Sequence, residues 1–418
     1  MILRKFFDKS AQHGRCGPIA SKLATLQTLS FFMFLLQLLV MGLCLITLLA
    51  KPDETMPFLL QIGMVLLFSH GFDIFSHRFL EKNSHRVSPT GNTWEIGNYS
   101  EKAIRDLAKE TIQSIPPGYR NLTINIADCR HTTAWTFLTL LWPSRLISKR
   151  ISITSGSLYY LSPPELKAIL MHEIAHHFPS NRINPFGTLL MADISLYCAI
   201  FLVTLDWLPF SFAIVCFCCI RALGIRMIFH YLGDVFREIE HRCDLFSASI
   251  LGKAPIANAL LKIGEEEELV EAVIALSARR LMGCDYLELS DMYCAFNEVR
   301  PYGRIFHDNL FKHAAEVVKK IREDFHDCRS TTPANAELRD YLLKRKELGK
   351  CRIRWRLFDR HRKGFLSQDE LTELCEEMTR SPDKILVVSE DELSPTTHPG
   401  FQARIMAINH ERYGEVTS

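Results

Sequence analysis

The chain contains 418 residues, of which 48% are hydrophobic and 23% are charged, and its formal net charge at pH 7 is +2. This length allows two or three domains with a sizeable core. The near-neutral charge gives no indication of nucleic-acid binding. Its 13 cysteines are scattered without the spacing of a disulfide framework, which agrees with a cytoplasmic location for the soluble parts.

The first part of the chain is predicted to enter a membrane. Residues 1–28 are basic, and residues 29–75 are predicted to form two transmembrane helices. The stretch Leu29–Ala50 is almost entirely apolar and long enough to cross a bilayer, whereas Met56–Phe75 is a weaker candidate. Because lysine and arginine stay on the cytoplasmic side, the amino terminus and the chain after the second helix are predicted to face the cytoplasm.

Residues 76–254 are predicted to form the domain that carries the chemistry. The alternation in Arg150–Thr154 predicts a strand. Ser162, followed by two prolines and then Glu165, predicts a capped helix start, because serine and glutamate at this spacing bond each other's backbone N–H groups. Pro179 is predicted to end this helix.

The predicted helix carries the run His172-Glu173-Ile174-Ala175-His176. Residues four apart lie on one side of a helix, so both imidazoles can bind one metal ion. Glu173 is placed to take a proton from a metal-bound water, as the general base of a zinc hydrolase does. The alternative is a helix with two ordinary histidines. Burying these polar side chains among apolar neighbours would be costly, however, unless a cation satisfied them.

Two further apolar stretches, Pro185–Leu205 and Pro209–Phe229, predict a hydrophobic hairpin at residues 185–229. We expect it to associate with the membrane, because the arginines in the second stretch can extend to the interface. A hairpin in the protein core is the alternative. Asp193 is expected to face a protein interior rather than lipid. A membrane hairpin would return the chain to the side from which it left.

A catalytic zinc site usually has three protein ligands and one position for water. Glu240 and Asp244 follow the hairpin and, being four residues apart, share a helix face. Glu240 is the predicted third ligand, and Asp244 is predicted to accept a hydrogen bond from a ligand imidazole and fix its tautomer. Glu238 and His241 are rival ligands from the same segment. A solvated charged helix is the alternative interpretation.

Residues 255–394 are predicted to form soluble helices. The run Glu265–Glu268 is interpreted as the solvated start of one of them, where the helix dipole favours negative charge. Residues 359–370 have the layout of an EF-hand loop, but His361 and Lys363 occupy positions that require oxygen ligands. We therefore expect either a degenerate loop that keeps its turn or a chance match, without bound calcium, in a region that can serve as an interaction module.

Three motifs in this order resemble those of the HtpX-type membrane zinc endopeptidases, which are similar to the CAAX prenyl proteases of eukaryotes. The first is the strand and capped helix with the His172–His176 motif, and the second is the Glu240–Asp244 segment. The third is Thr397-His398-Pro399-Gly400-Phe401-Gln402-Ala403-Arg404, within the closing residues 395–418. The resemblance covers roughly residues 29–252 and the closing motif.

This resemblance implies an α+β fold, that of a helical membrane protein with a zincin-like metalloprotease domain. That domain would be mostly helical with a small β-sheet, and a helical carboxyl-terminal region would follow it. The resemblance also implies a gluzincin-type centre in which one Zn²⁺ is held by His172, His176 and Glu240, with Glu173 as the general base. The chain departs from the family pattern at Cys243, where the usual residue is small.

Candidate residues for the substrate and the transition state come from two other segments. His398 and Arg404 are candidate donors to an oxyanion, and His398 could instead occupy the open zinc position. An extended substrate is expected to lie along a sheet edge near Thr133, Ala134 and Trp135. The segment around these three residues matches the family only loosely.

The sequence therefore predicts an integral membrane zinc endopeptidase that cleaves misfolded or specific membrane proteins. The expected setting is the bacterial inner membrane, with several spans, an active site facing the cytoplasm, protein or peptide substrates, lipid contacts and no nucleic acid. An oligomer is compatible with this prediction. One alternative is a catalytically inactive pseudoprotease that acts as a membrane scaffold or regulator. A second is a zinc-containing regulatory protein that only binds unfolded or tail segments. Another is a CAAX-type prenyl-protein protease, which would need a larger membrane chamber.

Overall fold

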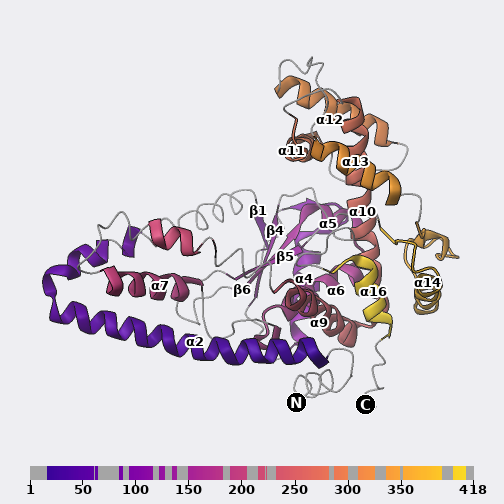
Figure 1. Cartoon of the computed structure of the whole chain (residues 1–418). Helices are drawn as coiled ribbons and strands as arrows, with labels where there is room; N and C mark the ends of the chain where they lie inside the picture. Colours follow the sequence, from indigo (N-terminus) through magenta and orange to yellow (C-terminus); the bar gives the residue numbers. More distant parts are fainter. Residues whose placement is uncertain are drawn as a thin grey trace, which may run out of the picture.

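The computed structural model describes part of the chain, and the described residues form many helices and two small sheets. The described residues are 17–60, 62–64, 84–87, 94–115, 122–127, 134–138, 149–181, 189–204, 215–221, 223, 232–281, 287–299, 309–324, 336–348, 352–387 and 399–410. They form a central body, a long arm built on α2 and α7, and a helical carboxyl-terminal region (Figure 1). A mostly helical chain with small sheets agrees with the predicted α+β class.

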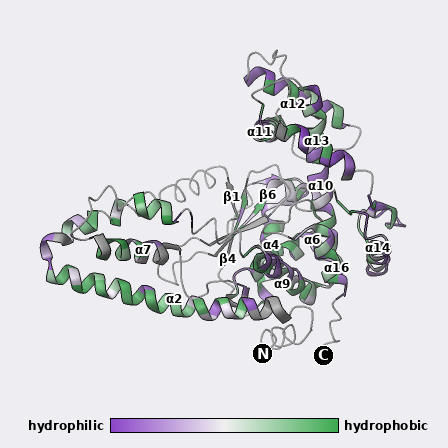
Figure 2. Ribbon diagram, viewed as in Figure 1, coloured by the Kyte–Doolittle hydropathy of each residue, from purple (hydrophilic) through white to green (hydrophobic). Residues whose placement is uncertain are grey.

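The arm is built on helix α2 (Gly17–Ala50), which is apolar along most of its length (Figure 2). Among the described residues, its stretch Lys22–Ala50 is the one helix long and apolar enough to cross a membrane, with a mean hydropathy of 2.6. It contains the first predicted span, Leu29–Ala50. Where the other predicted spans are described, they hold shorter apolar helices, at Thr55–Met64 and in α7 (Leu189–Thr204). The expectation of several spans is thus supported for one helix, on its length and composition.

One side of α2 packs against α7 through a small apolar core that includes Cys44 and Tyr197. Large apolar side chains on α2, such as Leu39, remain exposed. Within the arm, Asp193 is buried and accepts a hydrogen bond from Arg221, whose Nε lies 3.0 Å from Oδ1. The prediction that Asp193 faces a protein interior is therefore confirmed.

The body contains a four-stranded sheet. Its strand order is β1 (Ser84–Arg86), β4 (Leu122–Ala127), β6 (Lys149–Thr154) and β5 (Ala134–Leu138). Strands β4 and β6 are parallel, and the outer strands are antiparallel to them. Strand β6 confirms the strand predicted at residues 150–154, and β5 lies at one edge of the sheet. A separate two-stranded sheet joins β2 (Glu95–Ile96) and β3 (Tyr99–Ser100).

Helix α6 (Pro163–Ala175) lies at the centre of the body and contacts β5, β6 and three other helices. These helices are α4 (Glu101–Gln113), α9 (Gly233–Leu251) and α10 (Lys253–Arg280). Helix α16 (Phe401–His410), near the end of the chain, packs against both α9 and α10. The short helix α5 (Ser155–Tyr160) connects β6 to α6. The main hydrophobic core fills the space between the sheet and these helices.

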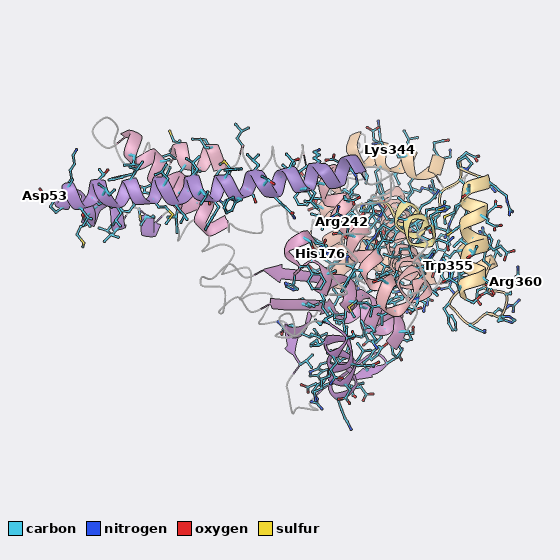
Figure 3. All side chains as sticks on the ribbon, turned by 90° about the horizontal axis from the view of Figure 1, so that it is seen from below. Asp53, His176, Arg242, Lys344, Trp355 and Arg360 are labelled. Atoms are coloured by element: carbon cyan, nitrogen blue, oxygen red, sulfur yellow. The ribbon has the colours of Figure 1, made fainter. Side chains whose placement is uncertain are left out.

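The far part of α10 extends out of the body and forms a second hydrophobic core with three helices. These are α11 (Leu289–Val299), α12 (Leu310–Asp324) and α13 (Ala336–Leu348). Figure 3 shows the length of the molecule, with Asp53 at the tip of the arm, Arg360 at the opposite end and His176 between them. The short 3-10 helices are η1 (Pro52–Glu54), η3 (Pro179–Asn181) and η5 (Trp355–Leu357).

The prediction for the run Glu265–Glu268 was wrong. This run lies in the middle of α10 rather than at its start, and both Glu266 and Glu268 are buried. Arginines from the following region explain how the charges are accommodated, because Arg356 binds Glu265 and Arg352 binds Glu268. The acidic run anchors the chain that follows α13 and is not a solvated helix terminus.

The loop at residues 359–370 keeps the turn expected of an EF-hand-like segment. The carboxylate of Asp359 accepts hydrogen bonds from the backbone N–H groups of Lys363 and Gly364. Gly364 has a φ of +77°, which favours glycine. Glu370, at the last ligand position of the pattern, instead forms a capping box with Ser367 at the start of α14 (Gln368–Arg380). Both end carboxylates therefore bond the backbone of the chain itself.

Candidate metal centre

Helix α6 starts as the sequence predicted and ends earlier. Ser162 is the N-cap, and its backbone N–H donates to Glu165 at 2.7 Å within a capping box. The last helical residue is Ala175, and His176 is the C-cap. Proline has no N–H to bond the carbonyl four residues earlier, which is that of Ala175, and it disfavours helical geometry in the residue before it. Pro179 therefore ends the regular helix at Ala175. The second histidine of the motif therefore sits at the helix end.

Three side chains converge at this end of α6. Nε2 of His172 lies 3.2 Å from Nε2 of His176. The carboxylate of Glu240, from α9, reaches both imidazoles, with Oε2 3.3 Å from Nε2 of His172 and Oε1 3.4 Å from Nε2 of His176. The structure thus brings together the three residues predicted as ligands, although they come from two helices separated by the hairpin segment.

The spacing of these donors fits zinc. Ligand atoms about 2.0–2.1 Å from a tetrahedral Zn²⁺ lie about 3.3 Å from one another. The separation of the two imidazole nitrogens, 3.2 Å, is close to that edge length. The carboxylate of Glu240 meets the two nitrogens through different oxygens, at 3.3 and 3.4 Å, so either oxygen could bind an ion held by the imidazoles. Two imidazole nitrogens and one carboxylate oxygen are also ligands that zinc accepts. The residues present could therefore hold one such ion.

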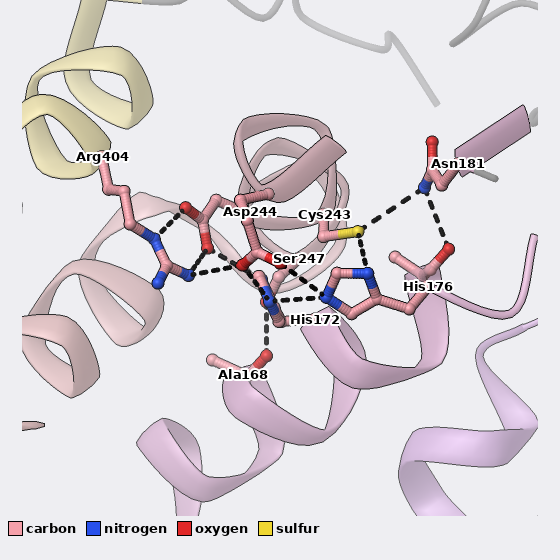
Figure 4. Close-up of polar contacts among 10 residues, drawn as sticks. Ala168, His172, His176, Asn181, Cys243, Asp244, Ser247 and Arg404 are labelled. Atoms are coloured by element: carbon pink, nitrogen blue, oxygen red, sulfur yellow. Dashed lines mark hydrogen bonds and ion pairs between the residues drawn. The ribbon is translucent and has the colours of Figure 1, made fainter. Parts of the chain in front are cut away.

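The carboxylate of Asp244 lies next to the ring nitrogen of His172 that is turned away from Glu240. Oδ1 of Asp244 lies 2.8 Å from Nδ1 of His172, so an Nδ1–H donor leaves Nε2 directed at the centre. Arg404 on α16 holds Asp244 with two hydrogen bonds of 2.7 Å, from Nε to Oδ2 and from Nη2 to Oδ1 (Figure 4). The sequence predicted Arg404 as a transition-state donor. In the structure, two of its guanidinium nitrogens are bonded to Asp244, and its role toward a transition state stays a prediction.

The charges at the centre favour a cation where the donors meet. Burial opposes a charge on His172, but Asp244 and Glu240 outweigh it and raise the pKa of His172 to about 10. Burial also disfavours the charge on Asp244, but Arg404 and His172 lower its pKa to about 2. Burial lowers the pKa of His176 below its ordinary value. The centre thus combines negative carboxylates with a histidine that attracts a proton, and a metal ion would satisfy the same groups.

His176 contacts α9 through a different neighbour. Its Nδ1 lies 3.5 Å from Sγ of Cys243, the residue just before Asp244. The side-chain amide of Asn181 lies 3.7 Å from the same sulfur and donates to the carbonyl of Ala175 at 2.9 Å. Sequence reasoning did not identify Asn181, because an asparagine five residues beyond the motif carries no recognisable pattern.

Glu173 is buried, and one of its carboxylate oxygens lies within 4.8 Å of a ring nitrogen of each motif histidine. Of the rival ligands, Glu238 binds Arg242 on its own helix at 3.0 Å. His241 is adjacent to Glu240, so the helical rotation turns it to a different side of α9. Glu240 therefore fits the third position better than either neighbour does.

Four predicted residues remain, of which two lie in β5 and two lie outside the described residues. Ala134 and Trp135 lie on the edge strand β5, next to β6. Thr133 and His398 lie outside the described residues. The predicted substrate edge and the predicted role of His398 therefore remain predictions.

The amino-terminal helix also contacts the elements that form the centre. Lys22 on α2 binds Asp234 on α9 at 2.7 Å. Gln27 donates to the carbonyl of Ser180, next to Asn181, at 3.3 Å. Leu23 is buried in the main core of the body. Helix α2 thus runs from the body into the arm without a break, a connection that the sequence alone did not indicate.

The family model described as peptidase family M48 matches residues 144–412, which is more than half of the chain and includes α6, α9 and α16. No curated protein and no solved structure matches the chain.

Proposed function

Since the chain belongs to peptidase family M48 and is therefore of a metallopeptidase family, we propose that it is a zinc endopeptidase of the HtpX-like type, anchored in a membrane. The observation that carries this proposal is the convergence of His172, His176 and Glu240 at zinc spacing beside the carboxylate of Glu173. Asp244 and Arg404 support the convergence, because a ligand histidine needs its second nitrogen held.

In the proposed mechanism, His172, His176 and Glu240 would hold the ion. When bound, zinc would supply Lewis acidity that acidifies a water molecule and polarises the scissile carbonyl. Glu173 accepts a proton as the water oxygen bonds to the carbonyl carbon. It then donates that proton to the amide nitrogen as the carbon–nitrogen bond breaks. Asp244 keeps the proton of His172 on Nδ1, so Nε2 stays available as a ligand.

Three observations support a membrane setting with the active site on the side of the basic amino terminus. Helix α2 is apolar and exposes large side chains along the arm. Its first turns are held to the body by Lys22 and Gln27. The positive residues before it favour the cytoplasmic side. Misfolded or specific membrane proteins are the substrates we propose.

The test uses the full chain purified in detergent, with metal analysis and cleavage of casein. Wild type should contain about one zinc per chain and cut the substrate, and chelation should stop the cleavage. Glu173→Gln should keep its zinc and lose cleavage, because the amide cannot accept the proton. Equal activity in Glu173→Gln would overturn the mechanism. A wild type that binds zinc without any cleavage would favour the pseudoprotease.

A further inference from the structure

The two histidines of the centre are supported by consecutive residues of α9 with different chemistry. Nδ1 of His172 meets a carboxylate oxygen of Asp244 at 2.8 Å. Nδ1 of His176 meets the sulfur of Cys243 at 3.5 Å. Figure 4 shows both contacts, that of His172 toward Arg404 and that of His176 toward Asn181. Each imidazole thus uses one nitrogen for the centre and the other for α9.

Cys243 is itself held in place. Its side chain is fully buried. Asn181 approaches the sulfur with its amide nitrogen at 3.7 Å and is fixed by its bond to the carbonyl of Ala175. An amide N–H is a donor, and the Nδ1 of a histidine that ligates through Nε2 also carries a hydrogen. The sulfur therefore accepts from both groups.

We propose that Cys243 and Asn181 are positioning residues that fix the tautomer and ring orientation of His176 for metal binding. This inference rests on the proposed function. A ligand histidine whose second nitrogen lacks a partner can rotate and change tautomer, which weakens metal binding. His176 has particular need of such support, because it lies at the C-cap, where the regular helix has ended.

The choice of sulfur has an electrostatic reason. The centre already contains the carboxylates of Glu173, Glu240 and Asp244, and Arg404 binds only the last of these closely. A second supporting carboxylate at position 243 would add a buried charge without a partner, which is costly. A neutral thiol is a weak acceptor that adds no charge. It can therefore orient His176 without raising the negative charge of the site.

The test measures zinc affinity of the full chain in detergent by competition with a chromophoric chelator. Loss of outer partners of metal ligands typically weakens metal binding by about 10–100-fold, and for a weak sulfur acceptor we expect Cys243→Ala near the lower figure. Cys243→Ser should retain most of the affinity, since the hydroxyl also accepts. The Co²⁺-substituted protein should show a shifted visible absorption in Cys243→Ala, because that spectrum reports the arrangement of the ligands.

The matched control is Cys375→Ala, which removes another buried thiol from the main core, on α14 rather than at the centre. Cys375→Ala should lower the stability of the protein without changing its zinc affinity or the cobalt spectrum. Asn181→Ala should weaken zinc binding less than Cys243→Ala does. Asn181→Ala should lower the zinc affinity less in the Cys243→Ala protein than in the wild type, because Asn181 acts partly through the sulfur.

Two results would overturn the inference. If Cys243→Ala and Cys375→Ala lose similar stability while both keep wild-type zinc affinity and cobalt spectra, Cys243 serves packing alone. If the Asn181 and Cys243 substitutions lower zinc affinity additively, Asn181 does not act through the sulfur of Cys243. A wild type that binds no zinc would instead overturn the proposed function, so the two failures are distinguishable.

Discussion

Arg404 and Asp244 are joined by two parallel hydrogen bonds of 2.7 Å, although they lie 160 residues apart in the chain. This pair links α16 to the carboxylate that supports His172. Because α16 also packs against α10 and α14, the end of the chain is part of the structure that supports the metal centre. A paired guanidinium also explains how the fully buried Asp244 remains charged.

Arg404→Leu should destabilise the protein, because it leaves the buried carboxylate of Asp244 without its partner. Breaking a buried ion pair from one side costs about 3–5 kcal/mol. We expect a clear fall in the thermal unfolding midpoint, measured in detergent, and weaker zinc binding. Adding Asp244→Asn should restore part of the lost stability, since the unpaired charge is removed, but not the zinc binding. If the two substitutions destabilise additively, the pair does not act as described.

Zinc binding should release about one proton at pH 6.5. The pKa of His172 is raised to about 10, so this histidine is protonated in the metal-free protein and must lose a proton from Nε2 to ligate. His176, whose pKa is lowered, should contribute little. The affinity should therefore rise about tenfold per pH unit from pH 6.5 upward, until the pH approaches the pKa of His172. Calorimetry in buffers of different ionisation enthalpy gives the proton count.

The control for this proton count is Asp244→Asn, which removes the main group that raises the pKa of His172. It should release clearly less than one proton at the same pH. Glu238→Gln, on the same helix but paired with Arg242, should leave the count unchanged. A wild type that releases no proton would mean that His172 is already neutral before zinc binds.

Glu240→Ala should lose most of the bound zinc, whereas Glu238→Ala should keep it. Both are buried glutamates on α9, but the carboxylate of Glu240 faces both histidines and that of Glu238 faces Arg242. Metal analysis of the two purified variants makes the comparison. Full zinc in Glu240→Ala would remove it from the ligand set. Loss of zinc in Glu238→Ala would restore the rival assignment.

Calcium should not stabilise the protein, but Asp359→Asn should destabilise it with or without calcium. The carboxylate of Asp359 bonds two backbone N–H groups of its own loop, and a lysine occupies a position that would have to supply an oxygen ligand. We expect equal unfolding midpoints of the wild type in calcium and in chelator. A midpoint that rises with calcium in the wild type, but not in Asp359→Asn, would instead identify a calcium site.

Local patterns predicted several elements of the metal centre and its surroundings. The capping box of Ser162 and Glu165, the strand at β6 and the shared face of Glu240 and Asp244 all depend on residues a few positions apart. Predictions failed where residues far away in the sequence determine the surroundings of a side chain. The run Glu265–Glu268 resembles a helix start in sequence, but arginines more than eighty residues later bind Glu265 and Glu268 in the middle of α10.

The sequence by itself determined which donors are available and how they are spaced, because helical periodicity is a local property of the chain. The tertiary structure decided which of these groups meet. It placed Glu240 across both imidazoles, Arg404 on Asp244, and Cys243 with Asn181 beside His176. Such contacts depend on how α6, α9 and α16 pack around a common core. Packing of this kind is set by the burial of many side chains together, and no single segment carries it.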